Sequence, residues 1–432
     1  MPRQGALYAV LVVAIVVAGA VGYFLGTAWA PQAITITVPV GTTVTRAVTV
    51  ATTATQAMTV THVYTYVATE TTVRTVVATR TVTTVVAPPI VPLGILVIMG
   101  GRTFEEGWRE VLRATGKERP RVGVIPTASG DPIAVGMDYV KLLGDMGAEA
   151  VLVEITEANC GTTAYDPAVV ELIRSLDAVF FTGGDQNRVS RCFLPGGRPT
   201  PALQALWELF IRGGVISGNS AGAAIMSDPM IGGGMDERVE ITRGLGFLLP
   251  GRVIVDQHFL ARGRFLRLLE AMIATGVRTG VGIDEDAAVV CTGGGRCRVI
   301  GTAPVVLVRL LDFNGTHYRF RLDYLAAGDW FDLESGEVGV AQGRRLVASG
   351  ALPGGPATSA EDVEVKTREG LARAIDRLVA SSSVTLRSVS ESRRVTYTLT
   401  LVREVGTSIY ETGYFGFLRY VATGVTLYLS KS

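Results

Sequence analysis

Short apolar runs alternate with amphipathic stretches between residues 93 and 220, and this pattern predicts an α/β domain. The apolar runs predict five buried strands, which read LGILVIMGG, RVGVIPTA, AEAVLVEI, LDAVFFTGG and GGVISGNS. The amphipathic stretches between them predict helices over residues 104–115, 133–146, 167–176 and 201–212. Because strands joined through crossover helices run parallel, we expect a parallel sheet flanked by helices. The working loops of such a sheet follow the carboxyl ends of its strands, where TGGDQ and GNSAG both fall.

The first 30 residues contain a long apolar run. Residues 7–25 are apolar or glycine and carry no charge, so they can cross a hydrocarbon core of ~30 Å as a helix. Arg3 precedes the run and no Lys or Arg follows before Arg46, which by the positive-inside rule puts the rest of the chain outside the cytoplasm. We expect residues 1–30 to be a retained, single-pass membrane anchor. The alternative is a secreted protein whose signal peptide is cleaved near Ala28 or Ala30.

Residues 31–92 form the next segment, and they are mainly Thr, Val and Ala with Glu70 as the single acidic residue between residues 34 and 86. The Thr-Val alternation has the period of a strand, but no glycine-rich turns divide it into hairpins. We therefore predict an extended stalk, with a small β-domain as the alternative. Three prolines, Pro88, Pro89 and Pro92, mark its end.

The remaining chain divides into an α/β domain over residues 93–338 and a small α+β appendage over residues 339–432. The appendage is predicted from an amphipathic helix over residues 361–380 and from the strand-like runs SVTLRSVS, RRVTYTLTLV and GVTLYLS.

Length and charge narrow the class of protein. A chain of 432 residues has room for two folded units and attachments. Its 40 Lys and Arg residues against 39 Asp and Glu residues give a net charge of +1. A net charge this close to zero gives no overall positive potential that would attract a polyanion, so we expect no nucleic-acid partner.

The segment Gly218-Asn219-Ser220-Ala221-Gly222 has the G-x-S-x-G pattern of a nucleophile elbow. It follows a predicted strand and precedes a probable helix start, which is the context in which a sharp turn lifts a serine hydroxyl above a sheet. The flanking glycines allow backbone to pack closely around such a turn. Ser220 is therefore the candidate nucleophile.

A nucleophilic serine needs a base, and the chain contains only three histidines. His62 lies in the predicted stalk. His317 lies beside the sequon-like Asn314-Gly315-Thr316, which belongs on a solvent-facing turn. His258 remains, and it follows an apolar strand together with the polar residues Asp256 and Gln257. We expect it at the carboxyl edge of the same sheet.

The third member of such a site is a carboxylate that orients the imidazole. The segment GVGIDEDAAVV offers Asp284, Glu285 and Asp286 at the end of one predicted strand. Their spacing does not choose among the three.

Four motifs in this order, FTGGDQ, GNSAGAAIMSD, DQHF with RGRFLRLL, and GIDEDAA, resemble cyanophycinase and its relatives, the aspartyl-dipeptidase-like serine peptidases. The similarity covers about residues 93–333. It implies a class I glutamine-amidotransferase-like, flavodoxin-like parallel sheet with a nucleophile elbow. The predicted transmembrane helix and Thr/Val-rich stalk precede this domain and lie outside the similarity.

The resemblance also implies roles for individual residues. Ser220 is the nucleophile, His258 the general base and acid, and Glu285 the orienting carboxylate. The N–H groups of Gly184 and Ala221 form the oxyanion hole. The candidate substrate-binding residues are Gln186, Asp256, Gln257, Arg262, Arg264 and Arg267. For the arginines, the alternative is the solvated face of a helix.

The four cysteines all follow the apolar run, where oxidation is permitted. Cys291 and Cys297 bracket a glycine-rich turn between predicted strands, so a bond across a hairpin fits them. Cys160 and Cys192 follow neighbouring strand ends and are the second candidate pair. The cysteine spacing does not resemble a zinc site, and no metal or cofactor is expected.

These features lead us to expect a membrane-anchored, extracytoplasmic serine exopeptidase of the cyanophycinase family. Its expected substrates are aspartyl-containing peptides, including β-Asp-Arg, cleaved through an acyl-enzyme on Ser220. The alternatives are a general aspartyl dipeptidase and a surface-binding protein on a catalytically retired fold. The candidate partners are an acidic or aspartyl peptide, the membrane through the N-terminal helix, and a second copy of the chain.

Overall fold

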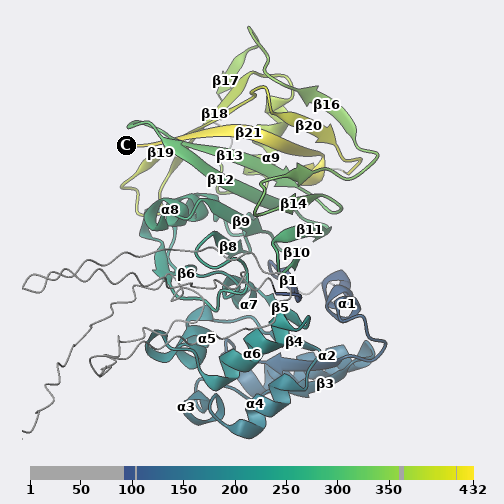
Figure 1. The fold of residues 1–432 in the computed structure, drawn as a ribbon. Coiled ribbons are helices and arrows are strands. Elements are labelled where there is room, and N and C mark those ends of the chain that lie inside the picture. Colours follow the sequence, from purple (N-terminus) through teal and green to yellow (C-terminus); the bar gives the residue numbers. More distant parts are fainter. Residues whose placement is uncertain (1–91, 103–104, 360–363, 415) are drawn as a thin grey trace, which may run out of the picture. The chain divides into compact units, whose positions relative to one another are not determined.

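The computed structural model describes residues 92–102, 105–359, 364–414 and 416–432 (Figure 1). The predicted anchor and nearly all of the predicted stalk lie outside these residues. Within the described ranges, no helix is long and apolar enough to cross a membrane. The chain from Val91 to Ser432 forms one compact unit.

The first sheet has nine strands in the order β15-β14-β11-β10-β1-β5-β4-β2-β3, and its pairs from β1 to β3 are parallel. The predicted parallel sheet is confirmed in these five strands, while β10, β11, β14 and β15 extend it antiparallel. Its strands are β1 (Ile95–Met99), β2 (Arg121–Ile125), β3 (Glu149–Leu152), β4 (Ala178–Phe181), β5 (Val215–Asn219), β10 (Ala287–Thr292), β11 (Arg296–Gly301), β14 (Trp330–Asp332) and β15 (Val338–Gly339).

The crossover helices of this sheet begin where the sequence supplies capping residues. Asp131, Asp166 and Thr200 each accept a hydrogen bond from a backbone N–H of the following turn, and each precedes a proline that suits the first helical position. The four predicted helices are present within a few residues of their expected ends. The helices of this region are α1 (Glu105–Ala114), α2 (Pro132–Asp145), α3 (Cys160–Thr163), α4 (Pro167–Arg174), α5 (Gln186–Phe193), α6 (Pro201–Ile211) and α7 (Ala221–Ala224), with the 3₁₀ turn η1 (Pro195–Gly197).

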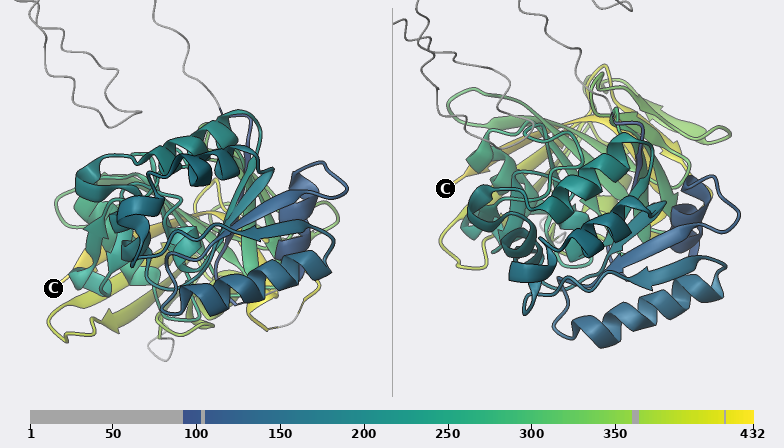
Figure 2. Two further views of the ribbon diagram at one scale, coloured as in Figure 1. Left: turned by 90° about the horizontal axis from the view of Figure 1, so that it is seen from below. Right: turned by 60° about the horizontal axis from the view of Figure 1, so that its bottom comes forward.

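Both faces of the first sheet are buried under helices (Figure 2). Leu96 and Ile98 of β1 pack in one cluster with side chains of α4, α5 and α6. Val97 and Met99 pack in another with Trp108 of α1. Since successive side chains of a strand point to opposite faces, this division explains why β1 is a continuous apolar run.

A second sheet has ten strands, and it contains the strands that lead to His258 and Glu285. Its main order is β17-β18-β19-β21-β13-β12-β9-β8, with β16 and β20 alongside. Its strands are β8 (Val253–Gln257), β9 (Thr279–Ile283), β12 (Val305–Phe313), β13 (Tyr318–Leu325), β16 (Arg345–Ser349), β17 (Ala357–Ser359), β18 (Ser383–Val389), β19 (Thr396–Val402), β20 (Ser408–Glu411) and β21 (Tyr420–Lys431). A short hairpin of β6 (Met230–Gly233) and β7 (Glu240–Thr242) lies apart from both.

The expectation that His258 follows a strand of the same sheet as Ser220 was therefore wrong. β8 pairs in parallel with β9 in the second sheet. After β9 the chain passes residues 284–286 and enters β10 of the first sheet. The chain thus passes from one sheet to the other at residues 284–286. The expectation failed because a short apolar run predicts a strand but does not say which strand it will pair with.

The C-terminal segment continues the second sheet. β21 pairs with β13, and β19 pairs with β21, so the strands of residues 339–432 share a sheet with β12 and β13. The predicted strands are present as β18, β19 and β21. The helix of this segment, α9 (Gly370–Leu378), is shorter than predicted, since residues 364–369 form turns and residues 360–363 lie outside the description. The remaining elements are α8 (Phe265–Thr275), η2 (Asp236–Arg238) and η3 (Gly416–Leu418).

Candidate active site

Ser220 stands at the sharp turn between β5 and α7. Its backbone has φ +57° and ψ −113°, a strained conformation for a residue with a side chain and the one expected of a nucleophile elbow. The turn also requires glycine at position 218, because a Cβ there would lie 2.2 Å from the carbonyl oxygen of Gly222. Local sequence thus explains why the hydroxyl of Ser220 is presented at the end of the strand.

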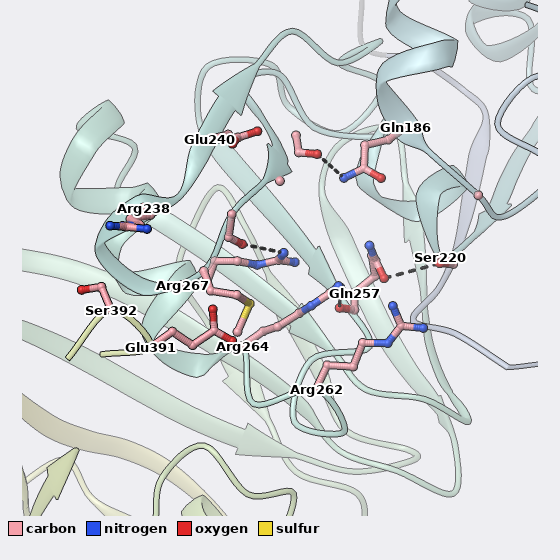
Figure 3. Close-up of a pocket in the computed structure, with 15 residues that line it drawn as sticks. Gln186, Ser220, Arg238, Glu240, Gln257, Arg262, Arg264, Arg267, Glu391 and Ser392 are labelled. Carbon is pink, nitrogen blue, oxygen red and sulfur yellow. Dashed lines mark hydrogen bonds between the residues drawn. The ribbon is translucent and has the colours of Figure 1, made fainter. Parts of the chain in front are cut away.

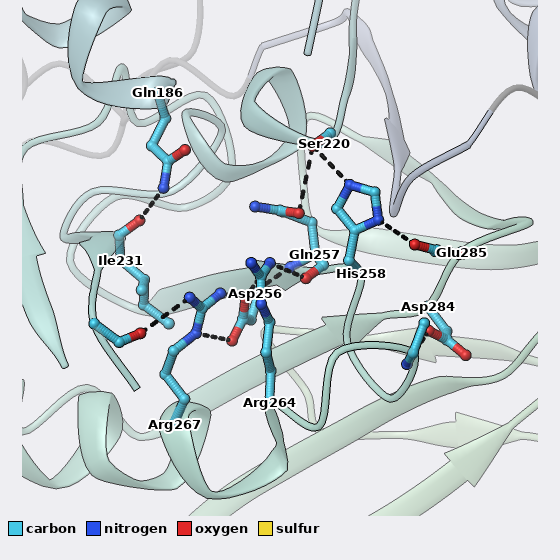
Figure 4. Close-up of polar contacts among 12 residues, drawn as sticks. Gln186, Ser220, Ile231, Asp256, Gln257, His258, Arg264, Arg267, Asp284 and Glu285 are labelled. Carbon is cyan, nitrogen blue, oxygen red and sulfur yellow. Dashed lines mark hydrogen bonds and ion pairs between the residues drawn. The ribbon is translucent and has the colours of Figure 1, made fainter. Parts of the chain in front are cut away.

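A chain of hydrogen bonds joins Ser220, His258 and Glu285 (Figure 4). The Oγ atom of Ser220 lies 2.8 Å from Nε2 of His258, and Nδ1 of His258 lies 2.7 Å from Oε1 of Glu285. The side chains of His258 and Glu285 are 8% and 17% exposed. With the imidazole proton on Nδ1, His258 donates to Glu285 and accepts from the serine hydroxyl, which is the arrangement that activates a nucleophile.

Of the other two histidines, His62 lies outside the described residues. His317 lies in the turn between β12 and β13, where the N–H groups of Thr316 and His317 both donate to Oδ1 of Asn314. Asn314 is exposed there, so the predicted solvent-facing turn is confirmed.

The backbone around His258 depends on two glycines that the sequence analysis did not single out. The N–H of His258 donates to the carbonyl of Gly100 at 2.6 Å, directly after β1. A Cβ at position 101 would lie 2.2 Å from Cε1 of the His258 ring. The two glycines that end the run LGILVIMGG were the feature of the sequence that could have predicted this contact. They form the backbone against which the imidazole of His258 packs.

The structure distinguishes the three adjacent acids. Asp284 is fully buried, and its Oδ1 atom accepts from the N–H of Ala261 at 2.8 Å. Asp286 has φ +63°, and its N–H donates to the carbonyl of Gly101. Only Glu285 directs its carboxylate to His258.

The charges around the imidazole set its resting state. Burial lowers the pKa of His258 below its ordinary 6.5, and the hydrogen bond to Glu285 opposes this effect, while the charges of Arg262 and Arg264 lower the pKa further. Burial acts to raise the pKa of Glu285, but the bond to His258 and nearby cations bring it below its ordinary value. At neutral pH the imidazole is therefore neutral and the carboxylate ionised, as a general base and its orienting acid require.

The two residues expected to form an oxyanion hole flank Ser220. Ala221 follows it in α7, and Gly184 lines the same cavity as Ser220. The loop before Gly184 is close to the nucleophile, since a Cβ at position 183 would lie 3.3 Å from Cβ of Ser220.

A cavity of about 600 Å³ opens beside Ser220 (Figure 3). Its charged lining consists of Arg238, Arg262, Arg264, Arg267, Glu240 and Glu391. Four guanidinium groups line the cavity against two carboxylates, and the buried Asp256 offsets the charge of Arg267, so a smaller net positive charge remains that favours a ligand carrying negative charge.

Two of the predicted substrate-binding residues are bonded to each other. The guanidinium of Arg267, in α8, donates to both carboxylate oxygens of Asp256, with Nε 2.9 Å from Oδ2. Their side chains are 5% and 1% exposed. The alternative of a solvated helix face is thus wrong for Arg267, which is a buried partner of Asp256 beneath the cavity.

The other predicted arginines lie just before α8. Arg264 is the residue at the start of the helix, and its Nη1 donates to the carbonyl of Gln257 at 2.6 Å. Burial lowers the pKa of Arg264 to about 10, so it stays charged at neutral pH. Arg262 is exposed at the cavity and forms no ion pair among the described residues.

The two predicted glutamines have different surroundings. Oε1 of Gln257 lies 3.5 Å from Oγ of Ser220, so this side chain is next to the nucleophile. Nε2 of Gln186 donates to the carbonyls of Ile231 and Gly232, at 2.9 and 3.1 Å, and so holds the β6 segment of the cavity wall.

Sequence analysis missed the contribution of the C-terminal segment to the cavity. Glu391 and Ser392, in the turn between β18 and β19, line it opposite Ser220 in the view of Figure 3. The N–H of Glu391 donates to the buried carboxylate of Asp236 at 3.0 Å. No local pattern marks such residues, because their position depends on pairing between strands far apart in the chain.

Both candidate cysteine pairs are bonded in the structure. Cys160 is joined to Cys192, and Cys291 is joined to Cys297 across the hairpin of β10 and β11. Over the described residues, no group of three or more His, Cys, Asp or Glu side chains is placed to hold a metal ion.

Sequence comparison with known proteins identifies the family of this chain. The model of Peptidase family S51 matches residues 95–299. A cyanophycinase of Nostoc sp. is 35% identical over 270 residues, which cover 57% of this chain and 87% of that protein. A cyanophycinase of Synechococcus elongatus is 32% identical over 269 residues, which cover 57% and 81%.

Among solved structures, a peptidase from an acI-B1 actinobacterium is similar, with a TM-score of 0.44 and 22% identity over 56% of this chain and 98% of that chain. The sequence matches define a serine-type peptidase. The chain belongs to peptidase family S51, the family of cyanophycinase and the aspartyl-dipeptidase-like peptidases.

Proposed function

We propose that this protein is an exopeptidase that hydrolyses aspartyl-containing peptides through an acyl-enzyme on Ser220. The observation that carries the proposal is the hydrogen-bonded chain of Ser220, His258 and Glu285 at the edge of an electropositive cavity. The relatives named cyanophycinase support a substrate built from aspartyl units.

In the proposed first half-reaction, Oγ of Ser220 attacks the carbonyl carbon of the scissile bond and gives its proton to Nε2 of His258. The carboxylate of Glu285 holds the Nδ1 proton and stabilises the imidazolium. The N–H groups of Gly184 and Ala221 donate to the oxyanion as it forms.

The tetrahedral intermediate then collapses, the C–N bond breaks, and His258 gives its proton to the departing amine. The second half-reaction repeats these steps with water. Nε2 of His258 takes a proton from water as the hydroxide attacks the ester, and returns it to Ser220 when the acid product leaves. Each proton that His258 accepts is therefore returned within the cycle.

The exposed guanidinium of Arg262 is the group we propose for binding a substrate carboxylate. Guanidinium groups bind carboxylates through charge-assisted hydrogen bonds, and Arg262 lines the cavity without an ion pair among the described residues. Oε1 of Gln257, next to the nucleophile, is placed to accept from a peptide N–H of the substrate.

The substrate assay compares three peptides with the purified protein: the β-Asp-Arg polymer, an ordinary aspartyl peptide and a matched peptide with Asn in place of Asp. We expect hydrolysis of at least one aspartyl substrate, with release of dipeptides from an end, and no hydrolysis by Ser220→Ala. Cleavage of the polymer alone identifies a cyanophycin-type enzyme, and cleavage of the ordinary peptide a general aspartyl dipeptidase. Equal cleavage of the Asn peptide would contradict the proposed specificity.

We also propose that the protein is held in a membrane by residues 7–25, with the catalytic domain extracytoplasmic. The charge-free apolar run and the two disulfides support this location. Membrane fractionation of the full chain should recover it with the bilayer. A mature N-terminus at Trp29 or Pro31 would instead establish a secreted protein. A homodimer stays a prediction, which sedimentation velocity of the purified protein tests.

A further inference from the structure

Arg368 belongs to the C-terminal segment, yet its side chain lies against the loop that carries the catalytic acid. It stands two residues before α9 and 69 residues beyond residue 299, where the family match ends. Nε of Arg368 donates to Oδ2 of Asp284 at 2.9 Å, and its Nη2 donates to the carbonyl of Glu285 at 3.2 Å. One guanidinium thus binds two consecutive residues of the acid loop.

The same network reaches the segment that follows His258. Asp284 is fully buried, and the oxygen that Arg368 does not use accepts from the N–H of Ala261 at 2.8 Å. The Asp284 carboxylate therefore ties the acid loop both to Arg368 and to the turn after His258. Without Arg368, this buried charge would have no cation within ion-pair distance among the described residues.

Arg368 is itself held in place. Its guanidinium lies 5.0 Å from the ring centroid of Phe417, and its side chain is 27% exposed. Two residues earlier, Nζ of Lys366 lies 2.7 Å from the carboxylate of Asp236, which is fully buried. The carbonyl of Lys366 also packs against the turn at Gly263, where a Cβ would approach it to 2.3 Å. These contacts fix the direction from which the guanidinium approaches the acid loop.

We propose that Arg368 is a positioning residue that holds Glu285 in register with His258, so that the C-terminal segment completes the catalytic centre. This inference rests on the proposed role of Glu285 as the orienting acid. Arg368 contacts neither the imidazole nor the cavity, and it acts through the backbone and neighbour of Glu285. The guanidinium suits this role because two of its nitrogens, Nε and Nη2, lie at a fixed spacing and bind the Asp284 carboxylate and the Glu285 carbonyl separately, whereas an ammonium offers its donors from one flexible nitrogen.

The test measures kcat and KM for the aspartyl substrate in the full-length protein. The variants are Arg368→Met, Arg368→Lys, Glu285→Gln and the double variant Arg368→Met/Glu285→Gln. Arg368→Met should lower kcat roughly 10- to 100-fold, because a small displacement of a catalytic group is enough for such a loss. KM should stay within about twofold, since no substrate contact is removed. In the Glu285→Gln background, Arg368→Met should lower kcat by less than about threefold further, because both substitutions act on the same interaction, that between residue 285 and His258.

The control is Arg373→Met, at the fourth residue of α9 and 62% exposed, where kcat and KM should both match the wild-type protein. If Arg368→Met does not fold, Arg368→Lys carries the test: its ammonium keeps the charge but not the fork, so kcat should fall between those of the wild type and Glu285→Gln. A wild-type kcat for Arg368→Lys would overturn the proposal.

Two further outcomes separate this inference from the proposed function. If Glu285→Gln lowers kcat but Arg368→Met does not, or if their losses multiply in the double variant, Arg368 does not act through Glu285 and the inference is overturned alone. If Glu285→Gln itself leaves kcat unchanged, the proposed orienting acid is wrong, and the role of Arg368 is overturned with it.

Discussion

Arg267 and Asp256 form a buried, two-point ion pair beneath the substrate cavity. The resemblance to cyanophycinases had implied that both residues bind substrate. The structure instead pairs them with each other and leaves Arg262 as the exposed arginine nearest the start of α8. Arg267 therefore stabilises the wall of the cavity, whereas Arg262 is free to bind a substrate.

The first prediction concerns stability. Arg267→Met should lower the free energy of unfolding by about 3 kcal/mol, because it removes both guanidinium hydrogen bonds to the buried carboxylate of Asp256 and leaves Arg264, 3.8 Å away, as its remaining cation. The exposed Arg262→Met is the matched control and should change it by less than ~0.5 kcal/mol. Urea unfolding measures both. Equal, small effects would show that the Asp256 charge is compensated in some other way.

The second prediction concerns substrate recognition. Arg262→Gln should raise KM for an acidic aspartyl peptide by about tenfold or more, because a charge-assisted hydrogen bond contributes ~1.5–3 kcal/mol. The same variant should hydrolyse a neutral ester analogue at the wild-type rate. Steady-state kinetics on the two substrates decide the matter, and a comparable loss on both would assign Arg262 a structural role instead.

The third prediction concerns pH. kcat/KM should fall as the pH drops through the pKa of His258, since a protonated imidazole cannot accept the serine proton. Burial places this acid limb below pH 6.5. Glu285→Gln should move the limb to still lower pH, because it removes the bond and the charge that raise the pKa of His258. A wild-type midpoint above 6.5, or an upward shift in the variant, would be inconsistent with this reading of the site.

The fourth prediction concerns the disulfides. The Cys160–Cys192 bond spans 32 residues and the Cys291–Cys297 bond only 6. On the chain-entropy relation these loops contribute ~3.7 and ~2.2 kcal/mol, so replacing the first pair by Ala should destabilise the protein more than replacing the second. Unfolding in urea without a reductant gives the comparison. A larger loss from the Cys291 and Cys297 pair would show that native packing, rather than loop length, sets the contribution.

The nucleophile and the base were identifiable from the sequence because few candidates competed. Ser220 lies in a local pattern whose backbone geometry is determined within five residues. His258 followed from elimination among three histidines, and the structure brings its Nε2 to Ser220. The capped helices and the continuous apolar strands were predictable for the same reason, since nearest neighbours in the chain determine them.

The features of the site that could not be predicted from the sequence depend on contacts between distant segments of the chain. The spacing of Asp284, Glu285 and Asp286 says nothing about which side chain turns toward the imidazole, and the family resemblance alone distinguished them. The roles of Arg262 and Arg267 depended on where α8 begins and on which residue Asp256 meets. Arg368 and Glu391 reach the site through hydrogen bonds to Asp284 and Asp236, which are 84 and 155 positions away in the chain, and such contacts leave no local pattern.

The central claim is that Ser220, activated by His258, is the nucleophile. The most direct measurement is kcat for the aspartyl substrate with Ser220→Ala protein whose near-ultraviolet circular dichroism matches that of the wild type. Because the three residues act as a unit, we expect a loss of at least ~10⁴-fold, with His258→Ala as severely affected and substrate binding retained in both. Near-normal turnover by the folded Ser220→Ala protein would contradict the account.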